Sequence, residues 1–460
     1  MNTAVKAVAI GMLGLCIGVL PVTADTLKSA VQQALSSNPT VKAADANMRA
    51  LTYDLLEQDA GYQPSVRLFG SAGVVNVDDP QGLSAADNAR TRANGEIGLV
   101  ASLTLFDGYR RANQVYASAA RVDQGAFELL DASETMALMV TEQYINIARQ
   151  QHLLKVAQAS LQRLRKIDRQ AATLVEGGRL PASARFQVEA NVLATQSTIA
   201  DIQLQLSDAT ARYKQLVGKP AHAGFPIPSV VQPHKSIETF VQQAINNSYR
   251  VKIASKSVDV RGFEQQAADA DFAPQLSLNG GVSAGENLDG SPGSESNVFL
   301  GVELSWQLSR AGRYERQQAF GERRNAALYD RMAVVREVEA LANVAWHAFL
   351  NNTLKLDLAR SQARSYRNLK RSYEQEFELG TRTVLDLLIA ENRLFNGEVD
   401  EVNNRAILSF SGYRALATQS KLAKFFGVKQ ADRVLAQTLD AKSGDKPRVV
   451  IQNGRVIINQ

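Results

Sequence analysis

The sequence predicts a mixed fold in which a duplicated unit supplies two membrane-length β-strands and one very long α-helix per copy. Three observations carry this prediction: an internal repeat, four segments of alternating residues, and two long stretches without helix breakers. The segment VQQAL at 31–35 precedes Pro64, and VQQAI at 241–245 precedes Pro274 at the same spacing. A repeat of about 200 residues is far longer than a solenoid repeat. It indicates two similar halves, at 25–230 and 231–427, followed by a tail at 428–460.

The chain begins with a pattern typical of a secretory signal peptide at 1–24. Lys6 precedes an apolar run, and small residues precede Asp25. The run is shorter than the ~20 residues that a transmembrane helix needs. The single cysteine, Cys16, lies within this segment. We therefore expect a mature chain without disulfides, thiol chemistry or a lipid anchor.

The charge distribution argues against nucleic-acid binding. The formal net charge is +5, and acidic and basic residues are mixed along the predicted helices. Nucleic-acid-binding proteins instead concentrate basic residues on one face. No segment after residue 24 has the composition of a membrane-spanning helix. If the exported chain crosses a membrane, it must do so with β-strands.

Four segments alternate between apolar and polar residues, at about 64–77, 94–106, 274–284 and 297–308. Only Phe299 interrupts the polar row of the last segment. Each segment has the length of a tilted transmembrane strand, whose lipid and lumen faces alternate. A soluble antiparallel sheet packed on a core would show the same period, and this alternative stays open.

Four strands cannot form a closed barrel by themselves. Membrane-spanning barrels begin at about eight strands, and an open edge in lipid would leave backbone groups unpaired. Several copies must therefore pool their strands, as a dimer with eight or a trimer with twelve. The segments between paired strands are rich in Gly, Pro, Asp and Ser, so we expect polar turns in water.

Each copy also contains a long predicted helix, at about 111–175 and 313–379. About 65 helical residues span roughly 95 Å, more than an ordinary globular domain. Apolar residues recur at spacings of three, four and seven, which is typical of a coiled-coil seam. Each rod should turn back at a tip, at about 176–182 and 378–384, where glycines are expected to end one helix. Thr383 and Asp386 fit a capping box that begins the next helix.

The second tip closely resembles a motif of the TolC family of bacterial outer-membrane exit ducts. The run ELGTRTVLDLL at 378–388 is similar to the family's Val-Gly-Thr-Arg-Thr-x-x-Asp-Val-Leu, and EGGRLP at 176–181 stands where the family has its first tip. Together with the repeat, strands and rods, the resemblance covers roughly 25–427. It implies a homotrimer whose twelve-stranded outer-membrane β-barrel continues into an α-helical barrel across the periplasm.

The resemblance also implies partners and site residues. The partners would be a periplasmic adaptor (membrane fusion) protein, an inner-membrane ABC or proton-driven pump, and outer-membrane lipid. Arg382 and Asp386 match tip positions that would line the inner mouth, and we expect these two side chains to contact each other across one helical turn. The candidate adaptor-docking residues at the two tips are Gly178, Arg179, Gly380 and Thr381.

Two departures from the family pattern concern gating. Ile389 stands where some relatives carry a second acid, and Ala184 occupies the first tip without a nearby aspartate. The sequence therefore does not support a second ring of acidic residues at the inner mouth, or an aspartate that would latch the first tip.

Nothing in the sequence predicts catalysis, a cofactor or a metal. The histidines are scattered, and no nucleophile elbow or phosphate-binding loop is present. Asn453-Gly454 between β-branched runs indicates a hairpin in the tail, without an assigned role. We expect a passive outer-membrane duct that extends into the periplasm, with type I protein secretion as the first choice of cargo pathway. The alternatives are drug or small-molecule efflux and, from another class, a periplasmic coiled-coil adaptor or scaffold.

Overall fold

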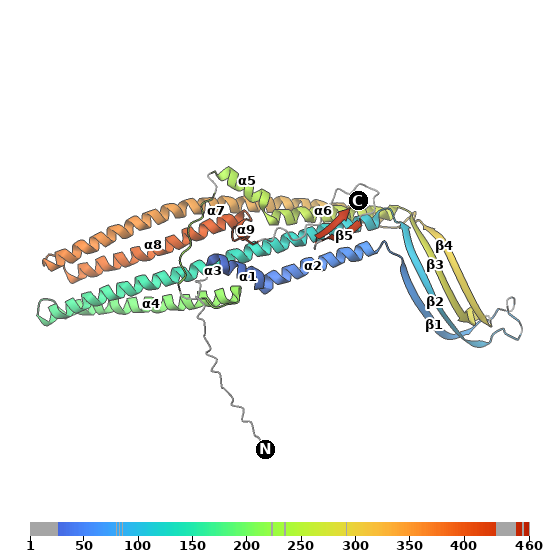
Figure 1. The fold of residues 1–460 in the computed structure, drawn as a ribbon, viewed down its shortest axis with the longest axis horizontal. Helices are drawn as coiled ribbons and strands as arrows, with labels where there is room; N and C mark the ends of the chain where they lie inside the picture. Colours follow the sequence, from blue (N-terminus) through green and yellow to red (C-terminus); the bar gives the residue numbers. More distant parts are fainter. Residues whose placement is uncertain are drawn as a thin grey trace, which may run out of the picture.

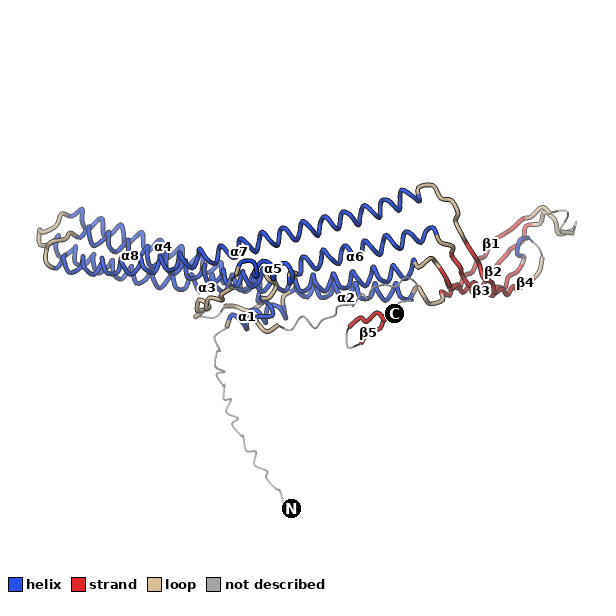
Figure 2. The backbone as a smooth tube through the Cα atoms, turned by 90° about the horizontal axis from the view of Figure 1, so that it is seen from above, coloured by secondary structure: helices blue, strands red, loops and turns tan. Residues whose placement is uncertain are grey.

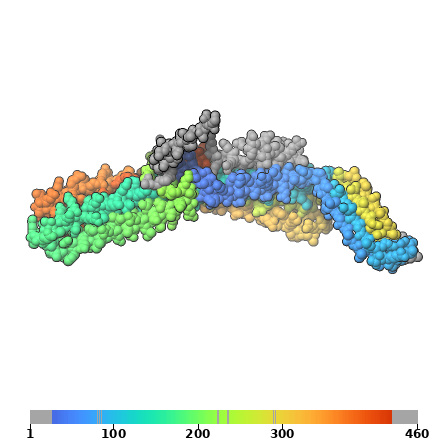
Figure 3. Space-filling model, turned by 60° about the horizontal axis from the view of Figure 1, so that its bottom comes forward, coloured from blue at the N-terminus to red at the C-terminus, as the bar shows by residue number. Residues whose placement is uncertain are grey.

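The structure is a computed structural model that describes residues 26–428 except 80, 82, 85, 222–223, 234–235 and 291, together with 448–452 and 455–459. The predicted signal peptide and Cys16 lie outside the described residues, as does most of the tail. The molecule is elongated: long helices run from one end to the middle and beyond, and a four-stranded sheet stands at the other end (Figures 1 and 3).

The two halves of the chain follow the same order of elements (Figure 1). The first contains α1 (Leu27–Ser37), α2 (Pro39–Ala60), β1 (Ser65–Asn76), β2 (Thr91–Phe106), α3 (Arg110–Glu176) and α4 (Ala182–Val217). The second contains α5 (Ile237–Asn247), α6 (Tyr249–Asp269), η1 (Ala270–Phe272), β3 (Gln275–Glu286), η2 (Leu288–Gly290), β4 (Ser294–Ser305), α7 (Arg313–Glu378), α8 (Val384–Thr418) and α9 (Leu422–Phe425). A hairpin of β5 (Arg448–Gln452) and β6 (Arg455–Asn459) follows, as its sequence predicts.

Each half begins with two helices rather than one. Asn38 separates α1 from α2, and its Oδ1 accepts a hydrogen bond from the Thr40 N–H at 2.9 Å. Ser248 separates α5 from α6, and its Oγ accepts from the Val251 N–H at 3.4 Å. Short polar side chains compete with the helical backbone and favour such caps. The chain therefore bends at the same place in both copies.

The four long strands form one antiparallel sheet in the order β1-β2-β3-β4 (Figure 2). Register places apolar residues on one face, with Leu68 opposite Leu99 and Leu278 opposite Val302. The other face is polar: the Ser102 hydroxyl donates to Asn279 at 2.7 Å, and the Asn279 amide donates to Glu303 at 2.8 Å. The apolar face is exposed; Leu300, for example, retains 78% of its accessible surface.

The last strand is displaced from its predicted position. It was expected at about 297–308, but β4 covers Ser294–Ser305. Ser305 pairs with Gln275, the residue after Pro274. Proline has no N–H to donate, so pairing with β3 cannot continue beyond it. Trp306 thus follows the strand, and its indole N–H donates to the Phe272 carbonyl at 3.2 Å.

The helix α3 extends through both ends of the helical region and contacts different helices at each end. Near the sheet it packs against α2 and α6, and α6 packs against α7; away from the sheet it packs against α4 and α8, and α8 packs against α7. Gly125 permits the close approach of α2, because a Cβ there would lie 2.6 Å from Leu51 Cδ1. Of the helices that the structure describes, none is long and apolar enough to cross a bilayer.

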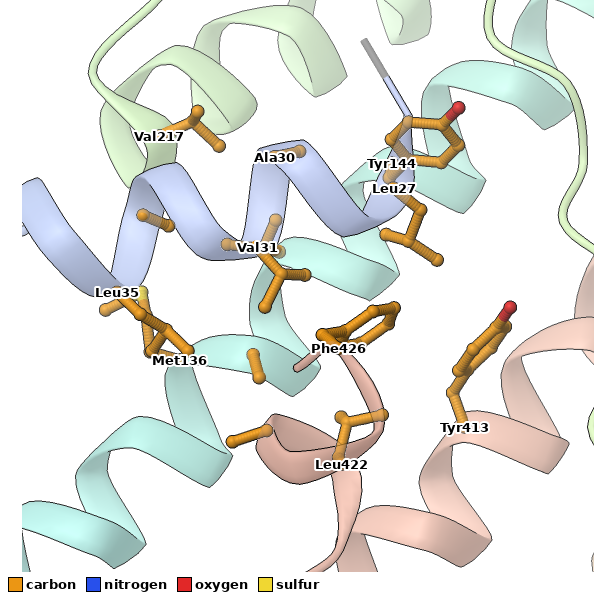
Figure 4. Packing of buried hydrophobic residues seen from close by; sticks show 14 of the residues in the cluster. Leu27, Ala30, Val31, Leu35, Met136, Tyr144, Val217, Tyr413, Leu422 and Phe426 are labelled. Carbon is orange, nitrogen blue, oxygen red and sulfur yellow. The ribbon is translucent and has the colours of Figure 1, made fainter. Parts of the chain in front are cut away.

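The largest core lies midway along the molecule, where both halves meet. Leu27 and Val31 of α1, Tyr144 of α3, Tyr413 of α8 and Phe426 gather there (Figure 4). Beside this core the buried Glu134 carboxylate of α3 accepts hydrogen bonds from the N–H groups of Leu422 and Ala423, at 2.9 and 3.1 Å. This contact fixes α9 to α3. Burial raises the pKa of Glu134 from 4.5 to about 7, against the lowering effect of the two hydrogen bonds.

We predict that Glu134 makes stability depend on pH. Its folded-state pKa lies above its ordinary value, so the folded chain keeps a proton that the unfolded chain releases. Its contribution to stability should therefore fall as pH rises from about 4.5 to about 7, by about 3 kcal/mol at most. In thermal unfolding of the purified protein, the advantage of wild type over Glu134→Gln should be larger at pH 5 than at pH 8. An equal difference at both pH values would contradict this.

Candidate functional site at the helical tips

The two helical hairpins turn at the same end of the molecule, opposite the sheet (Figures 1 and 2). At the first tip Gly178 has φ +70°, and the N–H groups of Gly178 and Arg179 donate to the carbonyls of Val175 and Leu174 at 3.0 and 2.8 Å. This is a Schellman motif, which satisfies the last carbonyls of α3. Glycine is favoured at this φ because it has no Cβ.

The second tip ends its helix in the same way. Gly380 has φ +79°, and its N–H and that of Thr381 donate to Phe377 and Glu376 at 3.0 and 2.9 Å. The Thr381 hydroxyl also donates to the Glu376 carbonyl, at 2.9 Å. Gly178 and Gly380 thus hold equivalent positions in the two repeats, and the sequence pattern located both.

The helix α8 begins with the predicted capping box. Thr383 Oγ1 accepts from the Asp386 N–H at 3.3 Å, and the Asp386 carboxylate accepts from the Thr383 N–H at 3.0 Å. The Thr383 hydroxyl also donates to this carboxylate at 2.8 Å, and the two hydrogen bonds that the carboxylate accepts from Thr383 lower the pKa of Asp386. Asp386 is thereby occupied in forming the helix start.

The expected direct contact between Arg382 and Asp386 is wrong. Arg382 Nε donates to the Glu376 carboxylate at 2.6 Å, and its guanidinium lies 4.3 Å from the centre of the Tyr373 ring. The i,i+4 rule applies within a helix, but Arg382 precedes α8 and folds back over the last turns of α7. Glu376 and Tyr373 are tip residues that the sequence analysis missed. The two residues are three positions apart and so lie on one face of α7, and this spacing could have identified them from the sequence.

An apolar cluster packs the tips together. Leu164 and Ile167 of α3 contact Val188 of α4 and Leu387 and Leu388 of α8. In contrast, Leu379, Leu385 and Ile389 are exposed, Leu379 to 79%.

A buried polar layer lies on the sheet side of this cluster. The sequence-based prediction did not include it. Glu391 of α8 has no accessible surface. Its carboxylate accepts from Arg163 Nε of α3 at 2.7 and 2.9 Å and from the Ser160 hydroxyl at 2.8 Å. Glu391 follows Leu387 and precedes Leu394 at the spacing of a helical seam. A charged residue at a seam position could have indicated this buried polar layer from the sequence.

A groove opens between α3 and α7 on the tip side of this layer. Its volume is about 410 Å³, and its lining includes Lys166 of α3, Arg371 and Phe377 of α7, and Leu387 of α8. Within the described ranges no group of three or more histidine, cysteine or acidic residues could hold a metal ion.

The Outer membrane efflux protein family matches residues 30–219 and 240–408, which include both helical tips and all four long strands. The chain belongs to this family. Its members are outer-membrane channels rather than enzymes. This chain is therefore an outer-membrane efflux channel that extends into the periplasm of a Gram-negative bacterium.

Individual relatives are distant. Outer membrane efflux protein BepC of Brucella suis biovar 1 (strain 1330) is 21% identical over 425 residues, 88% of either chain. Cation efflux system protein CusC of Escherichia coli (strain K12) is 24% identical over 192 residues, which are 39% of this chain and 42% of that protein.

Solved structures have the same fold. The outer-membrane channel OprN gives a TM-score of 0.73 at 18% identity, over 86% of this chain and 89% of its own. The outer membrane protein VceC of Vibrio cholerae gives 0.73 at 16% identity, over 87% and 96%. The open MtrE channel of Neisseria gonorrhoeae gives 0.70 at 17% identity, over 87% and 88%.

We predict that Gly178 and Gly177 respond differently to alanine. Gly178→Ala forces a side chain into left-handed backbone and should cost about 1 kcal/mol locally. Amide hydrogen exchange at the first tip should then accelerate about five-fold. Gly177→Ala is the matched control, because Gly177 has φ −80° and only ordinary contacts around its Cβ position. Equal exchange in both variants would contradict the role of Gly178.

Proposed function

We propose that three copies of this chain form a passive exit duct. Its twelve-stranded barrel crosses the outer membrane, and its helices form a barrel across the periplasm. The observation that carries the proposal is the pairing of the sheet: within the described residues, β1 pairs only with β2 and β4 only with β3. Unpaired edges are not tolerated in lipid. Pairing β4 of one copy with β1 of the next removes every edge, and a head-to-tail contact of this kind forms rings.

The outermost helices of one copy, like its outermost strands, have a neighbouring element on one side only. Near the sheet the outermost helices are α2 and α7, and away from it they are α4 and α7. The surfaces of α4 and α7 carry exposed apolar side chains: Phe186, Leu193 and Leu204 on α4, and Leu350, Leu354 and Leu358 on α7. Packing α7 of one copy against α2 and α4 of the next would cover these residues.

Exposed aromatic residues mark the periplasmic boundary of the proposed membrane-spanning zone. Phe106, Tyr109, Phe272 and Trp306 are exposed where the strands meet the helices. Aromatic residues of this kind mark the interface between lipid and water in membrane barrels. The apolar face of the sheet begins there, which supports a lipid-facing assignment for that face and a lumen-facing assignment for the polar one.

The tips are proposed to bind the periplasmic adaptor and to form the gate. Gly178, Arg179, Gly380 and Thr381 form the exposed turns at which an adaptor hairpin would dock, beside the exposed Leu379. Arg382 and Asp386 would recur three times around the closed mouth, where charged rings influence ion passage. Opening is a shift of the tip helices, driven by stronger binding of the adaptor and pump to the open state.

Small-molecule efflux is the cargo class that the comparisons favour. The names of both BepC and CusC contain the word efflux. Type I protein secretion is the second candidate, supported by the Gly-Thr-Arg-Thr tip at 380–383.

We expect loss of the chain to distinguish the two cargo classes. If it serves efflux, a deletion strain should accumulate dyes and become sensitive to small toxic compounds. If it serves secretion, a large protein should disappear from the culture medium while compound sensitivity stays unchanged. Restoration by the cloned gene is the control, and no effect in either assay would contradict a duct.

We also predict that an arginine substitution destabilises the barrel on one face of β4 and not on the other. Leu300→Arg places a charge on the lipid face and should destabilise the barrel by about 2–4 kcal/mol. Asn297→Arg introduces the same residue on the polar face of the same strand, opposite Ser283. The measurement is the amount of heat-resistant trimer in outer membranes after carbonate washing. Asn297→Arg should be near wild type and Leu300→Arg strongly reduced; equal amounts would contradict the assignment of the faces.

A further inference from the structure

Arginines gather around η1, at the end of the molecule where β4 is followed by α7 (Figure 1). Arg110 of α3 donates through Nη2 to the Asp271 carboxylate at 2.8 Å, and Arg316 Nε of α7 lies 3.6 Å from the other carboxylate oxygen. The Arg313 guanidinium, also of α7, lies 4.6 Å from the centre of the Phe272 ring. Three arginines from two helices thus surround one short segment that supplies a single carboxylate.

The positive charge of this group exceeds its negative charge. A fourth arginine, Arg310, is exposed in the turn before α7, and the first turn of α7 adds one acid, Glu315. Four arginines therefore stand against two carboxylates. Each guanidinium has five N–H donors, and the buried Nε atoms of Arg110 and Arg313 have no hydrogen-bond partner among the described residues. We call the four residues the junction arginines: Arg110, Arg310, Arg313 and Arg316.

The corresponding junction of the first repeat has its own acid. There Arg111 lies over the Tyr62 ring at 4.7 Å, as Arg313 lies over its aromatic neighbour. However, Arg111 Nε donates to Asp107, four residues earlier, at 2.7 Å. Four residues before Arg313 the chain has Ser309 instead. Joining a strand to a long helix therefore does not require the excess of positive charge, which belongs to the second repeat alone.

The junction arginines lie at the periplasmic boundary of the proposed membrane-spanning zone. Trp306 and Leu308 continue the alternation of the apolar face of β4, and they are 55% and 73% exposed. The indole N–H of Trp306 donates to the Phe272 carbonyl at 3.2 Å, which brings Trp306 close to Arg313. The headgroup layer on each side of a bilayer is about 5–7 Å thick. One turn of helix is about as long, so the first turn of α7 falls within this layer.

We propose that the junction arginines bind the phosphate of an anionic phospholipid in the periplasmic leaflet of the outer membrane. Guanidinium groups bind phosphate through paired N–H donors, and basic residues beside a membrane recognise anionic headgroups. The acyl chains of the lipid would lie along Trp306 and the apolar face of β4. The proposal rests on the proposed function in one respect, namely that this face of the sheet lies in the outer membrane.

The test removes two of the junction arginines that are exposed. Arg310→Gln with Arg316→Gln lowers the positive charge by two and leaves the 2.8 Å ion pair at Asp271 in place. The matched control is Arg323→Gln with Arg324→Gln, which removes the same charge from exposed residues of the same helix. These two residues lie roughly 10 Å further from the sheet than Arg316, beyond the reach of the headgroup layer.

Purified wild type and both double variants are placed in nanodiscs of dioleoyl-phosphatidylcholine with increasing fractions of dioleoyl-phosphatidylglycerol. Native mass spectrometry identifies the lipids that the protein retains, and the unfolding temperature is measured at each composition. Because the two lipids have the same acyl chains, a difference between them reports the headgroup. Wild type should retain phosphatidylglycerol preferentially and should unfold at a higher temperature as its fraction rises.

The two double variants should differ in this preference. The Arg310/Arg316 variant should bind phosphatidylglycerol about 30-fold more weakly than wild type, which is about five-fold for each arginine. The Arg323/Arg324 control should retain the preference of wild type. Equal loss in both variants, or no loss in either, overturns the site.

Two further measurements in neutral detergent identify the occupant. Inorganic phosphate, at the concentration of phosphatidylglycerol that stabilises wild type, should leave the unfolding temperature unchanged, because it lacks acyl chains. An equal rise with inorganic phosphate overturns the assignment to a lipid. Without added lipid, the Arg310/Arg316 variant should form as much trimer as the control. Loss of trimer would mean that these arginines contact the acidic end of α2 in the next copy, and it overturns the site.

The outcomes separate this proposal from the proposed function, because all four junction arginines belong to one copy. Conducting trimers that show no preference for phosphatidylglycerol overturn the lipid site and leave the duct. Protein that prefers phosphatidylglycerol but forms neither trimer nor channel overturns the duct and leaves the lipid site.

Discussion

The constraint on which the structure depends is that backbone N–H and C=O groups must be paired inside a bilayer. A chain with four antiparallel strands satisfies this for β2 and β3, whereas β1 and β4 each keep one unsatisfied side. The fold cannot satisfy that requirement within one copy. In the proposed trimer, association between copies is therefore part of folding, and the exposed apolar residues of α4 and α7 would extend the same contact into the periplasm.

The duplicated architecture suits this requirement. Each repeat contributes one strand pair and one helical hairpin, and both hairpins end in the same glycine-based motif at Gly178 and Gly380. The core around Tyr144 and Tyr413 joins the two repeats midway along the molecule. Glu134 lies in this junction, and its burial links the junction to pH.

Much of the fold followed from the sequence because lipid and coiled-coil packing impose periodic patterns. Alternation located all four strands within about three residues, since every second side chain must be apolar. It placed the end of β4 three residues too late, because that end is decided by Pro274 on the neighbouring strand. At the tip, capping by Thr383 and Asp386 was predicted from local spacing, whereas the partner of Arg382 was not. That partner depends on how the turn folds back over α7, which no helical spacing rule describes.

The continuous helix α3 runs from Arg110 at the sheet to Glu176 at the tip. The distance between membrane and tip is therefore set by residue count rather than by flexible joints. Lengthening α3 alone would bring Arg163 out of step with Glu391. A change of reach across the periplasm would require matched insertions in α3, α4, α7 and α8, in multiples of about seven residues that preserve the seam. Relatives adapted to a wider or narrower envelope should differ in such coordinated steps.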